Sequence, residues 1–210
     1  MIKNPEEQEL LLKELLLQKD KDEQTIWHLA ARSIHPDVFK MLLDVADKRL
    51  SKEELLSLLQ SKDMMGWTAW HLSAENGRAD SLNTLWEWVK KVHLNENESK
   101  KNWLLSQDSS GSAWHLAAHR GHVTVLKKLW DWAREMNLNL KKDLLLVEDD
   151  SGRNAGHLAA ERGNTETLEK ILHWAKEAKL NFASDLLLAK DRNGQTPLEL
   201  LKDFFYIRIY

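Results

Sequence analysis

Cysteine is absent from this 210-residue sequence, which contains only three prolines and eight glycines. The absence of cysteine excludes disulfides, thiolate metal ligands and a cysteine nucleophile, and it suits a reducing, cytoplasmic setting. Few prolines and glycines leave little to interrupt regular structure. Because leucine, lysine, glutamate and alanine dominate instead, the composition predicts an all-α chain.

An excess of one charge and long apolar runs are also missing. With 30 basic and 33 acidic residues the formal charge is −3, which excludes a strong field toward nucleic acid or anionic membranes. No stretch approaches the roughly 20 apolar residues of a membrane-spanning helix, and Glu9, Lys13 and Glu14 interrupt the N-terminal segment. We expect a soluble, intracellular monomer without nucleic-acid or membrane partners.

What the sequence does contain is an internal repeat. The strings "TIWHLAA", "TAWHLSA", "SAWHLAA" and "NAGHLAA" begin at residues 25, 68, 112 and 154, and a divergent "TPLELLK" begins at residue 196. Successive copies place their histidines 43, 44 and 42 residues apart. This regularity indicates one structural unit that is used several times along the chain.

Each unit has the same predicted order of elements. Polar turns of the Asp-x-x-Gly kind, such as "DMMG" and "DSSG", precede the strings. An alanine-rich short helix follows and, in the central units, ends at Gly77, Gly121 or Gly163, where glycine can adopt the left-handed conformation that closes a helix. A longer amphipathic helix comes next, as in "DSLNTLWEWVKKVHL" from residue 80.

This pattern resembles the ankyrin repeat, whose signature Thr-Pro-Leu-His-x-Ala is followed by a turn and a second helix. The nearest matches are "TPLEL" from residue 196 and "TAWHLSA" from residue 68. The usual ankyrin period is 33 residues, so these units carry about ten extra residues, which fall after the second helix. Ser51 with Glu54 predicts a capping box, and hence a helical start, in one of these inserts. The resemblance implies an ankyrin-like α-solenoid of stacked helix-turn-helix units with short β-hairpin turns and helical inserts.

The repeat indicates a single ankyrin-like domain over residues 1–210. It divides into an N-terminal cap (1–19), four repeats (20–62, 63–107, 108–148 and 149–190) and a C-terminal partial repeat or cap (191–210). One residue is missing between Gly111 and Ala113 when the third copy is aligned with the others. Gly156 replaces the tryptophan of the other copies, and we expect neighbouring side chains to fill that space.

The first candidates for chemistry are the repeat histidines, His28, His71, His115 and His157. Equivalent positions in packed helices lie about 10 Å apart, whereas zinc holds a nitrogen at about 2 Å, so neighbouring copies cannot share an ion. In the ankyrin family this histidine is structural and ties hairpin to helix by hydrogen bonds. The resemblance implies the same role here.

A second histidine pattern leaves a weaker alternative open. His115, His119 and His122 are spaced four and three residues apart, and histidines four apart on a helix share one face, as in several zinc sites. A metal-dependent activity at this cluster is therefore the third hypothesis. Neither a phosphate-binding glycine loop nor a Gly-x-Ser-x-Gly motif is present, and we expect no catalysis, no metal and no cofactor.

Most of the ten tryptophans recur at helical spacing, so they are expected to pack in the core. Trp67 differs, because its counterparts are glutamine or arginine and no core role explains it. With Met64 and Met65 it forms the hairpin tip "MMGW". Either this tip packs locally on the neighbouring hairpin, or it forms an apolar contact patch, since methionine and tryptophan are enriched at interfaces.

The sequence as a whole favours a non-catalytic protein–protein interaction module, with a concave repeat surface that binds a protein of unknown identity. The alternative is a structural or regulatory scaffold segment of a larger protein. Arg120, Arg153 and Arg162 would surround the apolar tip and favour a partner with an apolar knob flanked by carboxylates. The predicted partner-binding residues flank the Asp-x-x-Gly turns or precede the turn glycines: Met64, Met65, Trp67, Glu75, Asn76, Ser109, Ser110, His119, Arg120, Asp150, Ser151, Arg153, Glu161 and Arg162.

Overall fold

The structure is a computed structural model that describes residues 4–92, 96–108, 110–181 and 183–209. These residues are mostly helical. The strands among them are β1 (Gln107–Asp108) and β2 (Gly111–Ser112), which pair as one antiparallel hairpin. The prediction of an all-α chain with short hairpins is confirmed. Within the described ranges, no helix combines the length and the apolarity that a membrane span requires.

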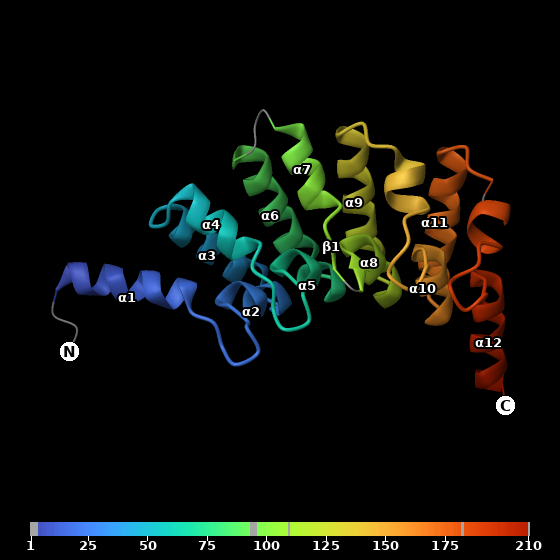
Figure 1. Cartoon of the computed structure of the whole chain (residues 1–210), viewed down its shortest axis with the longest axis horizontal. Helices are drawn as coiled ribbons and strands as arrows, with labels where there is room; N and C mark the ends of the chain where they lie inside the picture. Colours follow the sequence, from blue (N-terminus) through green and yellow to red (C-terminus); the bar gives the residue numbers. More distant parts are fainter. Residues whose placement is uncertain (1–3, 93–95, 109, 182, 210) are drawn as a thin grey trace.

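Short and long helices alternate along the chain and form two rows. The short helices are α2 (Ile26–Arg32), α5 (Ala69–Glu75), α8 (Ala113–Arg120) and α10 (Ala155–Glu161), and α12 (Pro197–Ile209) continues their row. The long helices are α3 (Pro36–Asp47), α6 (Ala79–Val92), α9 (Val123–Glu135) and α11 (Thr165–Glu177). Each short helix packs on the next short helix and each long helix on the next long helix, so the units follow one another along the long axis (Figure 1).

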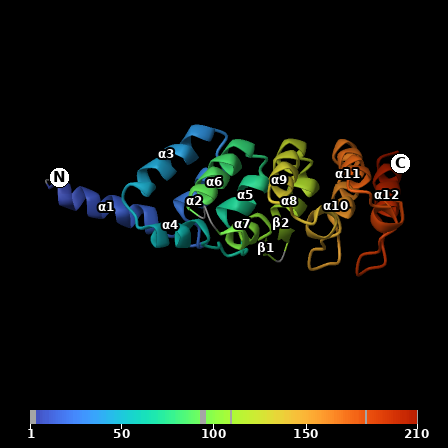
Figure 2. The same ribbon diagram turned by 90° about the horizontal axis from the view of Figure 1, so that it is seen from above.

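Further segments lie between the long helices and the hairpins that follow them, where the sequence predicts inserts. They are α4 (Lys52–Leu59), α7 (Asn97–Leu104) and the π-helical turns η1 (Lys141–Leu145) and η2 (Ala183–Leu187). The capping box at the start of α4 is confirmed, because Ser51 Oγ accepts from Glu54 N at 3.2 Å and Glu54 Oε2 accepts from Ser51 N at 2.9 Å. Helix α1 (Pro5–Leu17) precedes the first unit and extends beyond the rows (Figure 2).

The short helices share one kind of start, and the central three end at the glycines that the sequence predicts. At each start, Nδ1 of the repeat histidine accepts a hydrogen bond from the backbone N–H three residues earlier. After the central short helices, Gly77, Gly121 and Gly163 have φ angles of 69°, 79° and 64°. This left-handed backbone closes each helix and turns the chain toward the long helix.

Tryptophans form the core between successive units. Trp132 on α9 stacks on Trp86 of α6, with ring centroids 5.3 Å apart, and lies 5.9 Å from Trp70 of α5. The same arrangement recurs one unit later, with centroid distances from 5.1 to 6.3 Å among Trp114, Trp130 and Trp174. Each triad takes two rings from one unit and one ring from the next, so aromatic packing joins the units.

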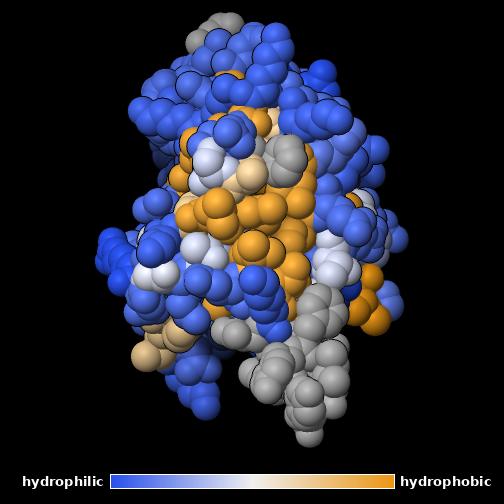
Figure 3. Space-filling model, turned by 90° about the vertical axis from the view of Figure 1, so that its right-hand side faces the viewer, coloured by the Kyte–Doolittle hydropathy of each residue, from blue (hydrophilic) through white to orange (hydrophobic). Residues whose placement is uncertain are grey.

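The last helix reaches the position where Gly156 replaces a tryptophan. Gly156 is buried, and Pro197 Cγ of α12 would lie 3.7 Å from a Cβ placed there, in agreement with the expectation that neighbours fill this space. Figure 3 looks at this end of the molecule and shows a broad apolar area. Leu188 and Leu198, in the last part of the chain, are 55 % and 37 % exposed.

Candidate functional site

One aspartate organises each hairpin between units. In the second hairpin, Asp63 Oδ1 accepts hydrogen bonds from the backbone N–H groups of Met65 and Trp67, both at 2.9 Å. Asp149 and Asp191 accept the equivalent pair of bonds in later hairpins. The turn leaves its tip in solvent, where Met65 is 66 % exposed.

The third hairpin is one residue shorter. It lacks a counterpart of Trp67 and Arg153, and Asp108 pairs directly with Gly111. Asp108 Oδ1 accepts from the N–H of Ser110 at 2.6 Å, while its buried Oδ2 has no hydrogen-bond partner among the described residues. Burial raises the pKa of Asp108 to about 6.

A cavity of about 180 Å³ lies beside the shortened hairpin. This hairpin cavity is lined by Trp67, Glu75, Ser110, His115, Leu116, His119, Arg120, Arg153 and Leu158. Three successive units contribute side chains to it. The lining includes six of the residues that the sequence predicts for partner binding: Trp67, Glu75, Ser110, His119, Arg120 and Arg153.

Trp67 forms one wall of the hairpin cavity. Its side chain is half-buried, packs on the hydrophobic core and donates from indole Nε1 to Ser110 Oγ at 3.4 Å. The expectation that no core role explains Trp67 is therefore wrong, and the alternative of local packing on the neighbouring hairpin agrees with these contacts. Met64, which is 69 % exposed, and Met65 are the outward apolar part of this tip.

Two arginines in the lining hold carboxylates. Arg120 Nε donates to Glu75 Oε1 at 2.8 Å, and a terminal nitrogen of the same guanidinium group donates to the same oxygen. Arg153 donates to Asp149 Oδ2 at 2.9 Å and to Glu161 Oε2 at 3.1 Å. These charge-assisted bonds fix the orientation of both guanidinium groups.

His119 is a neutral hydrogen-bond acceptor in the same lining. Its Nε2 accepts from Arg162 Nε at 2.7 Å. Burial first, and then the charge of Arg162, lower the pKa of His119, so the ring is uncharged at neutral pH. Within the described ranges, the terminal nitrogens of Arg162 have no hydrogen-bond partner.

The other predicted partner-binding residues lie outside the hairpin cavity. Asp150 and Ser151 are exposed at the tip of the fourth hairpin. Asn76 donates to the Leu72 carbonyl at 2.9 Å and so helps to close α5. Glu161 and Arg162 join the site through the side chains that they bind, whereas Ser109 lies outside the described residues.

The apolar floor of the cavity consists of Leu116 and Leu158, which were not among the residues predicted from the sequence. These side chains are 5 % and 3 % exposed. The signal was their position, because in the second, third and fourth copies the leucine after the repeat histidine stands three residues before a predicted binding residue, as Leu116 does before His119. Residues three apart share one face of a helix.

The four repeat histidines join helix and hairpin. Because each Nδ1 accepts a backbone N–H, the proton of the neutral ring lies on Nε2. Each Nε2 lies 3.0 or 3.1 Å from a carbonyl oxygen two residues before the next hairpin's aspartate, and donates to it. Burial lowers the pKa of all four rings. The hydrogen bonds implied for these residues are therefore present.

The histidines proposed as a metal cluster have separate partners. His115 is held at both ring nitrogens as described, and His119 accepts from Arg162. His122 Nε2 lies 3.0 Å from the Glu75 carbonyl oxygen. In the part of the chain that the structure describes, no group of three or more His, Asp and Glu side chains is placed to hold a metal ion.

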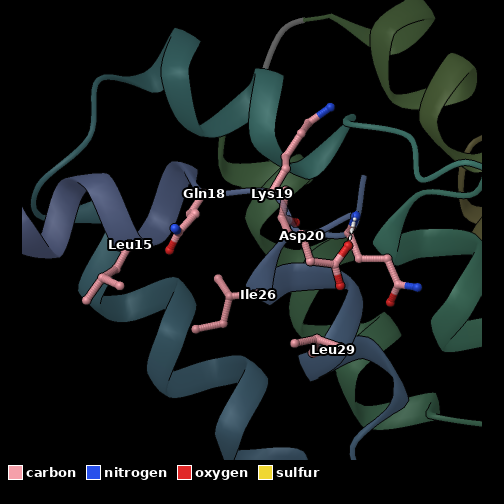
Figure 4. A pocket seen from close by; sticks show the side chains of 8 residues that line it. Leu15, Gln18, Lys19, Asp20, Ile26 and Leu29 are labelled. Carbon is pink, nitrogen blue, oxygen red and sulfur yellow. Dashed lines mark hydrogen bonds between the residues drawn. The ribbon is translucent and has the colours of Figure 1, made fainter. Parts of the chain in front are cut away.

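A larger cavity, of about 480 Å³, lies between α1 and α2 at the N-terminal end (Figure 4). Leu15, Ile26 and Leu29 supply its apolar side chains, and Lys19 and Asp20 also line it. Its lining contains none of the predicted partner-binding residues. The hairpin cavity is therefore the candidate site.

Comparison of the sequence with models of known protein families and with curated protein sequences found no match. The residues and geometry of the hairpin cavity are therefore the basis for assigning a function. Its chemistry combines an aromatic wall, an apolar floor and oriented guanidinium groups.

Proposed function

We propose that the chain is an ankyrin-like solenoid and acts as a monomeric, cytoplasmic, non-catalytic protein-binding module. Two rows of helices, one histidine-held hairpin per unit and tryptophan packing between units support this assignment. Stacked units of this kind present an extended surface while their core lies elsewhere. The hairpins and the short helices form the binding surface.

A single observation carries the proposal, namely the convergence of residues from three units on the hairpin cavity. A protein interface needs a buried anchor inside a polar rim. Trp67 and Leu116 supply apolar contacts, and Arg120 and Arg153 supply the polar rim. Exposed methionine at the adjoining tip adds apolar surface that adapts to different partners.

The proposal is tested by capture from cell extract with quantitative mass spectrometry. The Met65→Ser/Arg162→Glu double variant changes the binding surface, and both positions are exposed. Met41→Ser/Lys127→Glu is a matched control on the long helices, also at exposed positions. Proteins recovered with the parent chain should be lost with the first variant and kept with the second. Recovery of the same proteins with both variants would place binding on another surface.

A structural or regulatory scaffold segment is the second candidate. The apolar area at the C-terminal end favours it, because a broad exposed apolar patch commonly marks a contact with another folded unit (Figure 3). Sedimentation at several concentrations tests this candidate. Association that is abolished by Leu188→Glu and preserved in the Met65→Ser/Arg162→Glu variant would support it.

A further inference from the structure

We propose that the hairpin cavity is a socket for one aromatic side chain of the partner, carried on a segment with neighbouring carboxylates. This inference rests on the proposed protein-binding function and adds the chemical class of the ligand.

The socket exists because one residue is missing. In the hairpins on either side, Trp67 and Arg153 occupy the equivalent position, and both side chains line the cavity. In the third hairpin Gly111 leads directly to Ser112. A side chain in that register would stand between Trp67 and Arg153, where the cavity is.

The size of the socket fits a single ring. Its volume is about 180 Å³. Pockets for whole small-molecule ligands measure about 300 to 1,000 Å³, whereas a cavity of about 150 Å³ lined by apolar side chains holds benzene. The socket therefore has room for a phenylalanine or tyrosine ring, and it is too small for a nucleotide.

The apolar part of the lining suits such a ring. Leu116 and Leu158 are buried side chains at the floor, and Trp67 stands at one side. The indole N–H of Trp67 already donates to Ser110, which leaves the ring for aromatic contact. Aromatic pairs add to the gain from removing apolar surface from water.

Guanidinium groups in the lining, and that of Arg162 beside it, offer hydrogen-bond donors. Both carboxylate oxygens of Glu75 are occupied, by Arg120 and by Asn76 Nδ2. By contrast, one terminal nitrogen of Arg120 and both of Arg162 make no hydrogen bond to any described residue. Guanidinium groups bind carboxylates in a charge-assisted and often bidentate manner. These unoccupied guanidinium donors therefore favour carboxylate acceptors beside the ring.

The test uses three synthetic peptides as probes. One carries phenylalanine between acidic residues, one carries phenylalanine between lysines, and one carries alanine between acidic residues. Binding is read from the indole N–H signal of Trp67 in the isotope-labelled full chain, assigned with Trp67→Phe. The acidic phenylalanine peptide should shift this signal in a saturable way, and the other two should not.

The decisive variant has a glutamine inserted between Gly111 and Ser112, which restores the length of the other hairpins. The backbone N–H of the inserted glutamine would donate to Asp108, as the backbone N–H of Trp67 donates to Asp63 Oδ1. The melting temperature should therefore hold or rise, while peptide affinity falls about tenfold or more because the socket is filled.

A second variant keeps the proposal testable if the insertion does not fold. Ser110→Trp fills the socket from a position where the second hairpin carries the bulky Met65. Asn193→Trp is the matched control in the last hairpin, since Asn193 is exposed and absent from the cavity lining. Peptide affinity should fall with the first change and stay unchanged with the second.

Two results would overturn the socket. One is unchanged affinity in the filled variants, and the other is an equal shift with all three peptides. These variants leave Met65 and Arg162 intact. A captured protein that still binds the filled variants but loses the Met65→Ser/Arg162→Glu variant would therefore remove the socket and leave the proposed function standing.

Discussion

At the scale of the residue, His71 is almost fully buried and yet has a partner at each ring nitrogen. Replacing His71 with alanine removes the hydrogen-bond partner of the Thr68 backbone N–H and that of the Ser106 carbonyl oxygen. We expect His71→Ala to lower the free energy of unfolding by about 1 to 3 kcal/mol, because unsatisfied buried polar groups are destabilising. Urea denaturation followed by circular dichroism measures this change.

The control for His71→Ala is His173→Ala, since the side chain of His173 is 57 % exposed. The control should unfold at nearly the parental urea concentration. Metal analysis of the parent and of His71→Ala should give the same content. A stoichiometric zinc ion that disappears with His71 would contradict the hydrogen-bonding role assigned to this residue.

A second prediction concerns Asp108, whose Oδ2 lies 3.9 Å from His71 Nε2. Burial raises the pKa of Asp108 to about 6 and lowers that of His71 to about 4. The folded state therefore keeps the Asp108 proton longer than the unfolded state, and this contribution to stability is lost as pH rises from about 4 through 6. The His71 contribution has the opposite sign and is lost as pH falls from 6.5 toward 4.

Asp108→Asn separates the two contributions. At about pH 8 the variant should be more stable than the parent by about 1 to 3 kcal/mol, because it removes a buried charge whose Oδ2 accepts no hydrogen bond from the described residues. At about pH 4.5 this advantage should largely vanish, since Asp108 is then protonated in the folded state. Urea unfolding at both pH values measures it, and an equal advantage at both would contradict the assignment.

Trp67 combines a packing role with a binding role. We expect Trp67→Ala to weaken partner binding by roughly 2 kcal/mol or more, the scale of an interface hot spot. Because the side chain is half-buried, the free energy of unfolding should also fall, by about 1 kcal/mol. Titration calorimetry with a captured partner and urea denaturation measure the two effects. Full affinity together with a large loss of stability would make Trp67 a core residue alone.

At the scale of the element, the sequence predicted those features of a helix that depend only on residues close together in the chain. The Ser51 capping box and the left-handed Gly121 involve residues within four positions of each other, so their geometry follows from the chain itself. The π-helical form of η1 and η2 was not predicted. The apolar spacing of these inserts indicates a helical turn, but it does not distinguish an α-helical from a π-helical hydrogen-bond pattern.

The composition of the candidate site could be predicted from the sequence only in part. The repeat alignment identified Glu75, His119 and Arg153 one copy at a time, but their meeting in one cavity depends on how neighbouring units stack. The missing residue of the third hairpin was visible in the sequence. It has two consequences, namely a space beside Trp67 and an Asp108 oxygen without a hydrogen-bond partner in the described part of the chain. Both appear only when the adjoining hairpins are placed around the shortened one.

At the scale of the whole molecule, the tryptophan triads decide how far unfolding in one unit spreads to the next. Trp132 is buried and contacts Trp70 and Trp86 of the preceding unit. In a stack of units, stability is the sum of terms within units and terms at the interfaces between them. Removal of a contact at such an interface therefore weakens the energetic coupling between the units on its two sides.

Trp132→Ala should therefore lower the free energy of unfolding by about 3 to 5 kcal/mol, the usual loss for a buried tryptophan, and should also broaden or split the urea transition. Trp103→Ala is the matched control. It removes an equally large side chain, 6 % exposed, that belongs to insert helix α7. The control should lose stability while keeping a single sharp transition. Equal sharpness in the two variants would mean that the triads fill space without transmitting cooperativity from unit to unit.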